Sequence, residues 1–228
     1  MVSAAGCADT GQREVVFPVH ASGVEDPTFT SGAWTVTLDE ARVGLGPLYF
    51  CATLGADMDL CATARAEWLG SASADGLDPT LQMLGEGRGV TGGIGSMMLD
   101  YGRTWLLTLP EPRANDGAPE GHSLVLRGRA VSVARTITFE AAVDIDAQGP
   151  GEAAIGGLRT QRELDGTEAF ALRVDAVAWA ARMDFDEVAA LADATDHAVI
   201  DPGTPPHEDL ALAMRTARLP AVEWIARP

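Results

Sequence analysis

Four histidines are the side chains of this sequence that could bind a transition metal: His20, His122, His197 and His207. Imidazole suits copper and zinc, and a thioether such as that of Met97 or Met98 adds a preference for Cu(I). His20 lies at the end of the first predicted strand, and His122 begins a later one. Because strand ends can meet at one end of a β-sandwich, His20 and His122 are the predicted ligands of a transition metal, although nothing in their spacing requires them to meet. The alternative for each ring is an ordinary surface or hydrogen-bonded histidine.

A glycine-rich segment begins like a cofactor site and then departs from it. Residues 87–92 have the glycine spacing of a dinucleotide-binding loop, in which backbone N–H groups approach a pyrophosphate. No strand is predicted before them, and the glycines continue to Gly95, which disfavours a helix. We therefore expect a flexible loop here.

Two further motifs are incomplete. His207 and Glu208 open a zinc-protease pattern, but Ala211 replaces its second histidine. Residues 144–155 are acidic, but Ile155 stands where a calcium-binding loop has its closing glutamate, so an acidic hairpin is expected. With no catalytic motif complete, we expect a protein that is not an enzyme.

The three cysteines indicate the compartment. Residues 3–7 resemble the end of a bacterial lipoprotein signal, in which a small-residue run ends in the cysteine that becomes lipidated, here Cys7. Only two residues precede the run, so the usual apolar stretch of a signal is missing. The alternative is a cytosolic N-terminus with an incidental cysteine. A lipid on Cys7 would anchor the chain to a membrane, in the periplasm or at the cell surface.

The other two cysteines then remain as a pair. Cys51 and Cys61 are close in sequence, and outside the cytoplasm such a pair usually oxidises. A disulfide that closes so short a loop contributes about 2–3 kcal/mol to stability. Metal ligation or redox chemistry is the alternative, although the spacing is not Cys-x-x-Cys.

Composition limits the partners. The chain has 228 residues, of which 46% are hydrophobic, enough for one domain with a core. Its net charge is −17, and all 16 of its cationic side chains are arginines. An acidic surface repels phosphate backbones, so nucleic acid is not an expected partner. No apolar run approaches the ~18 residues that span a bilayer.

Alternation of apolar and polar residues predicts a mainly β protein. The segments with this period of two are residues 15–19, 34–38, 43–50, 124–130, 137–145 and 170–174. An apolar run over residues 97–109 is expected to form a more fully buried strand. Turn-rich segments between the strands, without a repeated strand–helix–strand rhythm, favour an antiparallel β-sandwich.

Helices are expected to be few. Asp184 can cap a helix with Glu187 three residues later, and residues 175–183 form a helical segment before it. The remaining expectations are a short helix over residues 62–69, loops over 70–95 and 111–121, and a final strand over 210–214. We expect residues 1–13 to be a signal remnant and tether, and residues 14–228 to form a single β-sandwich domain.

Residues 34–50 and residues 121–123, which contain His122, resemble segments of uncharacterised extracytoplasmic lipoproteins of myxobacteria and similar bacteria. Together with the strand-to-helix segment 170–185, the layout is distantly similar to the methanobactin-associated copper proteins (MbnP-like). That resemblance implies an extracytoplasmic β-rich protein, and some members of the family bind copper through histidine and an oxidised tryptophan. The family's ligands cannot be placed on this sequence.

These observations lead to one expected function and one alternative. The expected function is a non-enzymatic lipoprotein of the cell envelope that binds a ligand, with copper or another transition metal as the candidate. The alternative is a structural or adaptor lipoprotein that docks another envelope protein through a loop or a sheet edge.

Overall fold

The computed structural model describes residues 11–54, 60–61 and 64–227. The predicted lipidation of Cys7 and most of the predicted tether lie outside the described residues. β1 begins at Glu14, which is the first residue of the predicted domain.

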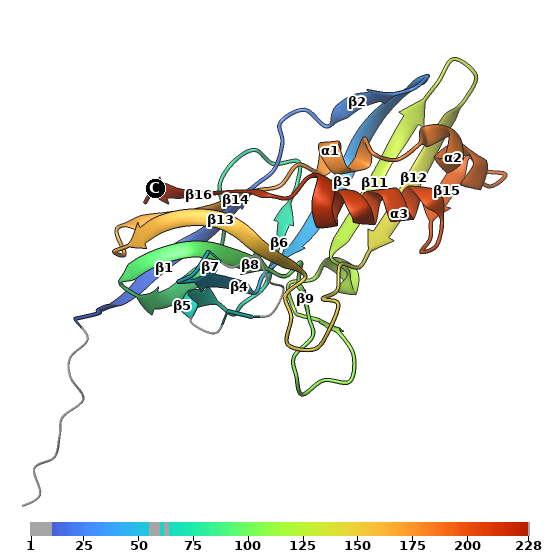
Figure 1. The fold of residues 1–228 in the computed structure, drawn as a ribbon. Helices are drawn as coiled ribbons and strands as arrows, with labels where there is room; N and C mark the ends of the chain where they lie inside the picture. The colour runs from blue at the N-terminus through green and yellow to red at the C-terminus, as the bar shows by residue number, and fades with distance from the viewer. Residues whose placement is uncertain (1–10, 55–59, 62–63, 228) are drawn as a thin grey trace, which may run out of the picture.

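Most strands belong to two mainly antiparallel sheets that pack together (Figure 1). Sheet A has eight strands in the order β13-β8-β4-β5-β7-β1-β14-β16. Its strands are β1 (Glu14–Ser22), β4 (Leu48–Cys51), β5 (Ala64–Trp68), β7 (Gln82–Val90), β8 (Gly92–Leu99), β13 (Ile155–Leu164), β14 (Glu168–Arg173) and β16 (Ala221–Ala226).

Sheet B follows the order β15-β12-β11-β3-β2, with β6 paired to the far end of β3. Its strands are β2 (Thr28–Ser31), β3 (Trp34–Leu45), β6 (Ala72–Asp75), β11 (Leu124–Val131), β12 (Thr136–Val143) and β15 (His197–Ile200). Two pairs are parallel, β1 with β14 and β12 with β15. A short ribbon of β9 (Arg103–Thr104) and β10 (Arg113–Ala114) lies beside the sheets.

The predicted alternation explains how the strands pack. In β12, Ile137, Phe139 and Val143 are buried, while Thr136 and Thr138 face solvent. A strand that alternates in this way buries one face and leaves the other exposed. The mainly β, antiparallel architecture that the sequence predicts is therefore confirmed.

Sheet A curls around an aromatic cluster. The ring centroids of Phe17, Phe50 and Phe170 each lie within 5.5 Å of that of Trp224 on the last strand. The indole Nε1 of Trp224 also donates to Thr160 Oγ1 at 3.1 Å, which joins the two edge strands β16 and β13. This contact brings the two ends of the sheet together.

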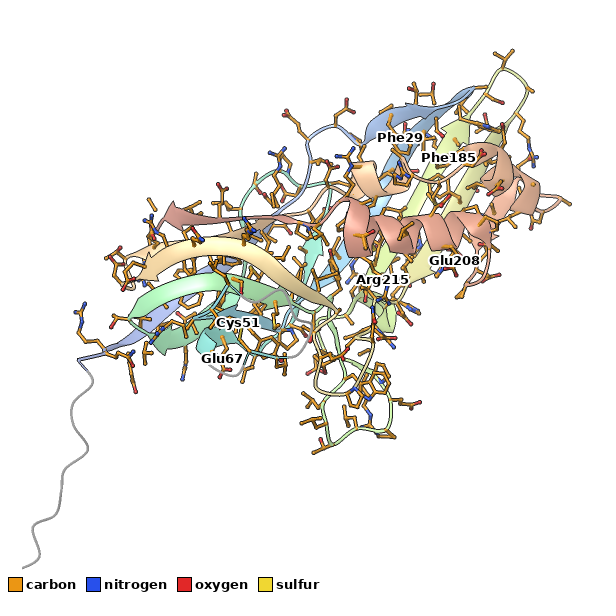
Figure 2. All side chains as sticks on the ribbon, viewed as in Figure 1. Phe29, Cys51, Glu67, Phe185, Glu208 and Arg215 are labelled. Atoms are coloured by element: carbon orange, nitrogen blue, oxygen red, sulfur yellow. A yellow bond between two sulfur atoms is a disulfide. The ribbon has the colours of Figure 1, made fainter. Side chains whose placement is uncertain are left out.

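Three short helices near the C-terminus pack against one face of sheet B (Figure 1). They are α1 (Ala176–Ala180), α2 (Phe185–Leu191) and α3 (Pro205–Leu212), and α3 continues into a π-helical turn, η2 (Ala213–Ala217). Asp184 caps α2 as predicted, by accepting from the backbone N–H of Asp186 at 2.9 Å. Phe185 then packs against Phe139 of β12 and Phe29 of β2. Phe29 and Phe185 are labelled in Figure 2.

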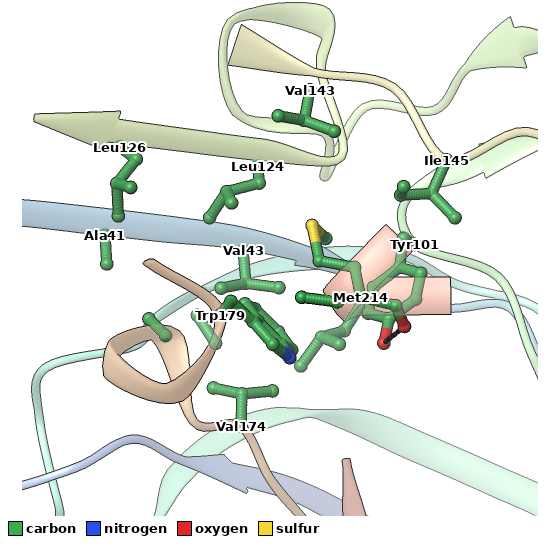
Figure 3. Packing of buried hydrophobic residues seen from close by; sticks show 14 of the residues in the cluster. Ala41, Val43, Tyr101, Leu124, Leu126, Val143, Ile145, Val174, Trp179 and Met214 are labelled. Atoms are coloured by element: carbon green, nitrogen blue, oxygen red, sulfur yellow. Dashed lines mark hydrogen bonds between the residues drawn. The ribbon is translucent and has the colours of Figure 1, made fainter. Parts of the chain in front are cut away.

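The two sheets share one continuous core. Figure 3 shows its centre, where the Trp179 indole lies between Val43 and Val174 and near the ring of Tyr101. The Tyr101 hydroxyl donates to the carbonyl of Met214 at 3.2 Å, and Trp179 Nε1 donates to that of Arg218 at 2.6 Å. The buried polar atoms of both rings are therefore satisfied by the backbone that follows α3.

The predicted disulfide is present. Cys51 at the end of β4 is bonded to Cys61, with 5.5 Å between their Cα atoms, and Cys51 is labelled in Figure 2. Cys51 packs with Tyr49, Met98 and Ala153 in a small second cluster on the outer side of sheet A.

Two predictions over residues 62–95 are wrong. Residues 64–68 form strand β5, not a helix, because β4 and β7 bond to both of its edges. Residues 70–95 contain β6, β7 and the start of β8 instead of a loop. The glycines of β7 lie where larger side chains approach: a Cβ on Gly87 would come within 2.3 Å of the Phe17 ring.

Two further expectations are corrected near the middle and the end of the chain. The buried strand predicted over residues 97–109 ends at Leu99, and Leu106 and Leu107 are exposed in a loop. Residues 210–214 are helical, not a strand, because two prolines open α3 and Leu210, Ala213 and Met214 bury one face at helical spacing.

Candidate functional site

A cavity of about 550 Å³ lies on the face of sheet B that turns away from the helices. Val125 of β11 and Glu140 and Ala142 of β12 line it. In β12 the two lining residues alternate with Phe139, which packs against Phe185 of α2. His122 lies in the wall just before β11, and His207 in the first turn of α3 completes the wall beyond the edge strand β15. The cavity therefore brings together side chains from distant parts of the sequence.

His122 is oriented by a carboxylate. A short 3₁₀ turn, η1 (Pro119–Gly121), ends at His122, and Gly121 takes the positive φ of 88° that this turn requires. His122 Nδ1 lies 2.9 Å from Asp144 Oδ1. Since a carboxylate only accepts, Nδ1 carries the proton of the neutral ring, and in that tautomer Nε2 has the lone pair that could bind a ligand. Histidines that bind metals are commonly held by such a carboxylate.

His207 is the unusual member of the cavity wall. The residue is only 8% exposed, and among the described residues neither ring nitrogen has a hydrogen-bond partner. The nearest charged atom is Glu208 Oε1, 4.0 Å from Nδ1, which is beyond hydrogen-bond distance. A buried polar atom without a partner costs about 1–3 kcal/mol, so a ligand at this wall would relieve a standing penalty.

Arg127 crosses the floor of the cavity among three glutamates. Its guanidinium lies 2.6 Å from Glu40, 3.0 Å from Glu120 and 3.5 Å from Glu140. The hydrogen bonds that Arg127 donates to Glu40 and Glu120 raise the pKa of Arg127 above its usual value. Because these charges compensate one another, Arg127 organises the floor and is not free to bind an anion.

The described lining carries an excess of negative charge. Glu120, Glu140, Asp144 and Asp201 supply four carboxylates, against the single guanidinium of Arg127. Apolar side chains, Val125 and Val199 among them, form the rest of the surface. Such a cavity attracts a cation more readily than an anion.

The two predicted ligands lie in different sheets. His20 is in β1 of sheet A, is 6% exposed, and has no hydrogen-bond partner for either ring nitrogen among the described residues. His122 precedes β11 of sheet B. The described polar contacts of the His122 ring lead to Asp144, and His20 is outside the cavity lining. The pairing of His20 with His122 stays a prediction that no described contact supports.

His207 was one of the four candidate histidines, but sequence reasoning did not select it as a predicted ligand. It also stood out as the first member of an incomplete zinc-protease pattern. Its place on the same cavity as His122 depends on how α3 docks, which sequence spacing does not reveal. The fourth histidine, His197, bonds to Thr138 Oγ1 at 3.0 Å and is outside the lining.

The donor set fits a metal only in part. In the described portion of the chain, no three side chains of His, Cys, Asp or Glu gather closely enough to hold a metal ion. His122 and His207 offer two imidazoles on one cavity, each with at least one ring nitrogen free of a hydrogen bond. Further ligands would have to come from solvent or from a bound molecule.

A second titratable group lies apart from the cavity. Asp100, after β8, is 2% exposed, and its Oδ1 accepts from the backbone N–H of Ala154 at 2.8 Å. Burial is the main cause that raises the pKa of Asp100 to about 7. The hydrogen bond from Ala154 lowers the pKa, and the negative charge of Asp146 raises it further. Burial also raises the pKa of the neighbouring Tyr49 to about 12.

Comparison with known proteins identifies no family. No protein-family model matches the chain, and no curated protein matches it. Among solved structures, MbnP from Methylosinus trichosporium is similar to this chain with a TM-score of 0.35 and 11% sequence identity, over 74% of this chain and 77% of that one. Nothing about this chain is inferred from a likeness of that size, and the resemblance to myxobacterial lipoproteins has no support from these comparisons.

Proposed function

We propose that the protein is a non-enzymatic binding protein of the cell envelope, and that its site is the cavity on sheet B, where His122 and His207 bind a transition-metal ion such as copper. One observation carries the proposal: His207 lines the same cavity as His122, and neither of its buried ring nitrogens has a hydrogen-bond partner among the described residues.

The chemistry of the wall supports a metal cation. Imidazole is a common ligand of copper and zinc, and Asp144 holds His122 with a ring nitrogen free. The excess of carboxylates around the cavity draws cations toward the two rings. Since the described lining of the cavity offers only two imidazoles, an exchangeable ligand would complete the coordination.

One observation, the disulfide, fits an address outside the cytoplasm. The disulfide between Cys51 and Cys61 is typical of oxidising compartments. Among the described residues, no helix is long and apolar enough to cross a membrane. Attachment through a lipid on Cys7 remains part of the proposal.

Equilibrium dialysis against Cu²⁺ and Zn²⁺ tests the site. We expect the full chain to retain copper stoichiometrically, and the His122→Ala and His207→Ala variants to lose it. His197→Ala is the matched control, because His197 lies on the same sheet but outside the cavity. A substoichiometric metal content in the unchanged protein would reject the proposal, as would a content that neither cavity variant lowers.

The orienting carboxylate gives a finer test. Asp144→Asn should weaken copper affinity about 10- to 100-fold, which is the usual effect of losing such a partner. Asp201→Asn removes an equal charge from the same lining without touching a histidine, so it should have a smaller effect. Equal effects of the two variants would show that Asp144 acts by charge alone.

A further inference from the structure

Arg103, in the β9–β10 ribbon, supports the wall of the cavity that carries His122, although it is outside the cavity lining. Its Nη1 donates to the carbonyl of Gly121, the residue before His122, at 2.9 Å. The same nitrogen lies 3.6 Å from Asp144 Oδ2, and the other oxygen of that carboxylate bonds to His122 Nδ1. Arg103 therefore contacts both the backbone that leads into His122 and the carboxylate that orients its ring.

The guanidinium of Arg103 is itself fixed by a second carboxylate. Its Nε donates to Asp146 Oδ1 at 2.7 Å, its Nη2 donates to Asp146 Oδ2 at 3.4 Å, and the Arg103 side chain is only 15% exposed. The planar guanidinium makes these contacts and those to Gly121 and Asp144 at the same time, which a lysine ammonium cannot do. Arg103 is therefore held in one orientation.

The two aspartates lie on a segment that is fixed to the core. Ile145, between them, is fully buried, and its N–H donates to Ser123 Oγ at 3.0 Å. The N–H of Ser123 in turn donates to the carbonyl of Val143 at 2.9 Å. This anchoring fixes the place of both carboxylates that contact Arg103.

A second arginine reaches the same segment from the other wall of the cavity. Arg215, labelled in Figure 2, lies in η2, which continues α3, about two helical turns after His207. Its Nη1 donates to the carbonyl of Asp146 at 3.1 Å. Asp146 thus accepts from Arg103 through its carboxylate and from Arg215 through its carbonyl. These contacts connect the wall that carries His122 to the helix that carries His207.

We propose that Arg103 and Arg215 are positioning residues, which together fix the distance between the two histidines of the cavity. The inference rests on the proposed metal site and adds that its two imidazoles are already placed before a metal binds. Ligands arranged in advance lose little conformational entropy on binding, so the arrangement favours affinity. Both arginines act through other groups, since neither belongs to the described lining.

Copper affinity separates positioning from charge. An Arg103→Met variant has one positive charge fewer, so charge alone predicts tighter binding of a cation. Loss of positioning predicts the opposite: in equilibrium dialysis of the full chain, we expect the variant to bind Cu²⁺ about tenfold more weakly or worse. Arg215→Met should also weaken binding. Arg103→Lys keeps the charge without the planar fork and should weaken binding as well.

Arg129→Met is the matched control. Arg129 forms an exposed ion pair with Asp39 at 3.2 Å on the same sheet, and it is outside the cavity lining. The control loses the same charge and should bind copper at least as tightly as the parent. Near-ultraviolet circular dichroism checks the fold of each variant, and Arg103→Lys replaces Arg103→Met in every measurement if the latter does not fold.

The metal-free protein gives a readout that does not depend on copper. Long-range proton–nitrogen NMR spectra at alkaline pH report which ring nitrogen of a neutral histidine carries the proton. The parent should show His122 as the Nδ1–H tautomer. Arg103→Met should show a mixture of both tautomers, because Asp144 is no longer held toward the ring. Arg215→Met and Arg129→Met should keep the signal of the parent.

Two results would overturn the proposal. One is a metal-free Arg103→Met variant in which His122 keeps the tautomer of the parent. The other is an Arg103→Met or Arg215→Met variant that binds copper as tightly as the parent. A parent protein that retains no copper rejects the proposed function instead, and the tautomer of His122 then decides alone whether Arg103 positions the ring.

Discussion

At the scale of single residues, Asp100 is a group whose titration in the folded protein differs strongly from that of an aspartate in water. Its carboxyl group is buried beside Ala154 and Tyr49, and burial raises its pKa from 3.8 to about 7. The folded protein therefore holds a proton on Asp100 at pH values where the unfolded chain has released it. Between about pH 4 and pH 7 the folded state binds more protons, so stability falls as pH rises.

Asp100→Asn should remove that pH dependence. The asparagine side-chain oxygen can still accept from the N–H of Ala154, but it cannot ionise. Relative to the parent, the variant should gain up to about 4 kcal/mol of unfolding free energy between pH 4 and pH 8, from a shift of about three pKa units. Urea unfolding across this range measures the difference, and parallel curves for the two proteins would contradict it.

Residue-level reasoning recovered part of the candidate site. The sequence marked His122 as a ligand candidate, and the structure places it on a cavity. The sequence did not single out His207 among the four histidines, because a histidine in the first turn of a helix that begins with prolines carries no signal of what it contacts. Asp144 was assigned to an acidic hairpin, and its contact with His122 depends on the pairing of β11 with β12.

At the scale of elements, the glycines of β7 explain why a strand was mistaken for a loop. Gly85, Gly87 and Gly89 weaken a local strand signal, since glycine has low intrinsic strand preference. In the sheet they leave room for Trp68, Phe17 and Ala66, respectively. The constraint that selects glycine is therefore tertiary and cannot be seen in the local sequence.

Gly87→Ala should destabilise the protein by about 1–3 kcal/mol, the usual cost of overpacking a core. The new Cβ would lie 2.3 Å from the ring of Phe17, which is itself packed against Phe50 and Trp224. Gly93→Ala in β8 is the control, because its nearest atom would be a glutamate oxygen at 3.5 Å. Thermal unfolding of both variants distinguishes the sites, and similar midpoints would count against this account of β7.

Strands with a clear alternation of apolar and polar residues were predictable from the sequence. Elements whose structure depends on contacts with other parts of the fold were not. β3, β11, β12 and β14 lie where the period of two predicts them. β5 becomes a strand because two neighbouring edges bond to it, and α3 is set by Pro205 and Pro206 and by its docking on the core. β16, residues 221–226, was missed, although Val222 and Trp224 alternate with polar or small residues.

At the scale of the whole molecule, the packed core stabilises the folded state and the repulsion between its negative charges destabilises it. One continuous core spans both sheets, while the surface carries most of a net charge of −17. Such self-repulsion destabilises a compact state and is screened by salt. We therefore expect the thermal midpoint to rise as sodium chloride increases from about 10 mM to about 300 mM at neutral pH.

The same titration near pH 4.4, the isoelectric point of the sequence, is the internal control. There the net charge is close to zero, so added salt should change the midpoint much less. A midpoint that is insensitive to salt at neutral pH would indicate that the acidic groups are already compensated locally.

The central claim is that one cavity on sheet B gathers His122 and His207 around a metal ion. Anomalous diffraction from copper-soaked crystals, collected at the copper edge, tests it most directly. The account predicts an anomalous peak at about 2 Å from a ring nitrogen of each histidine, the usual length of a metal–imidazole bond. A peak elsewhere, for example at His20, or no ordered copper in the cavity would contradict it.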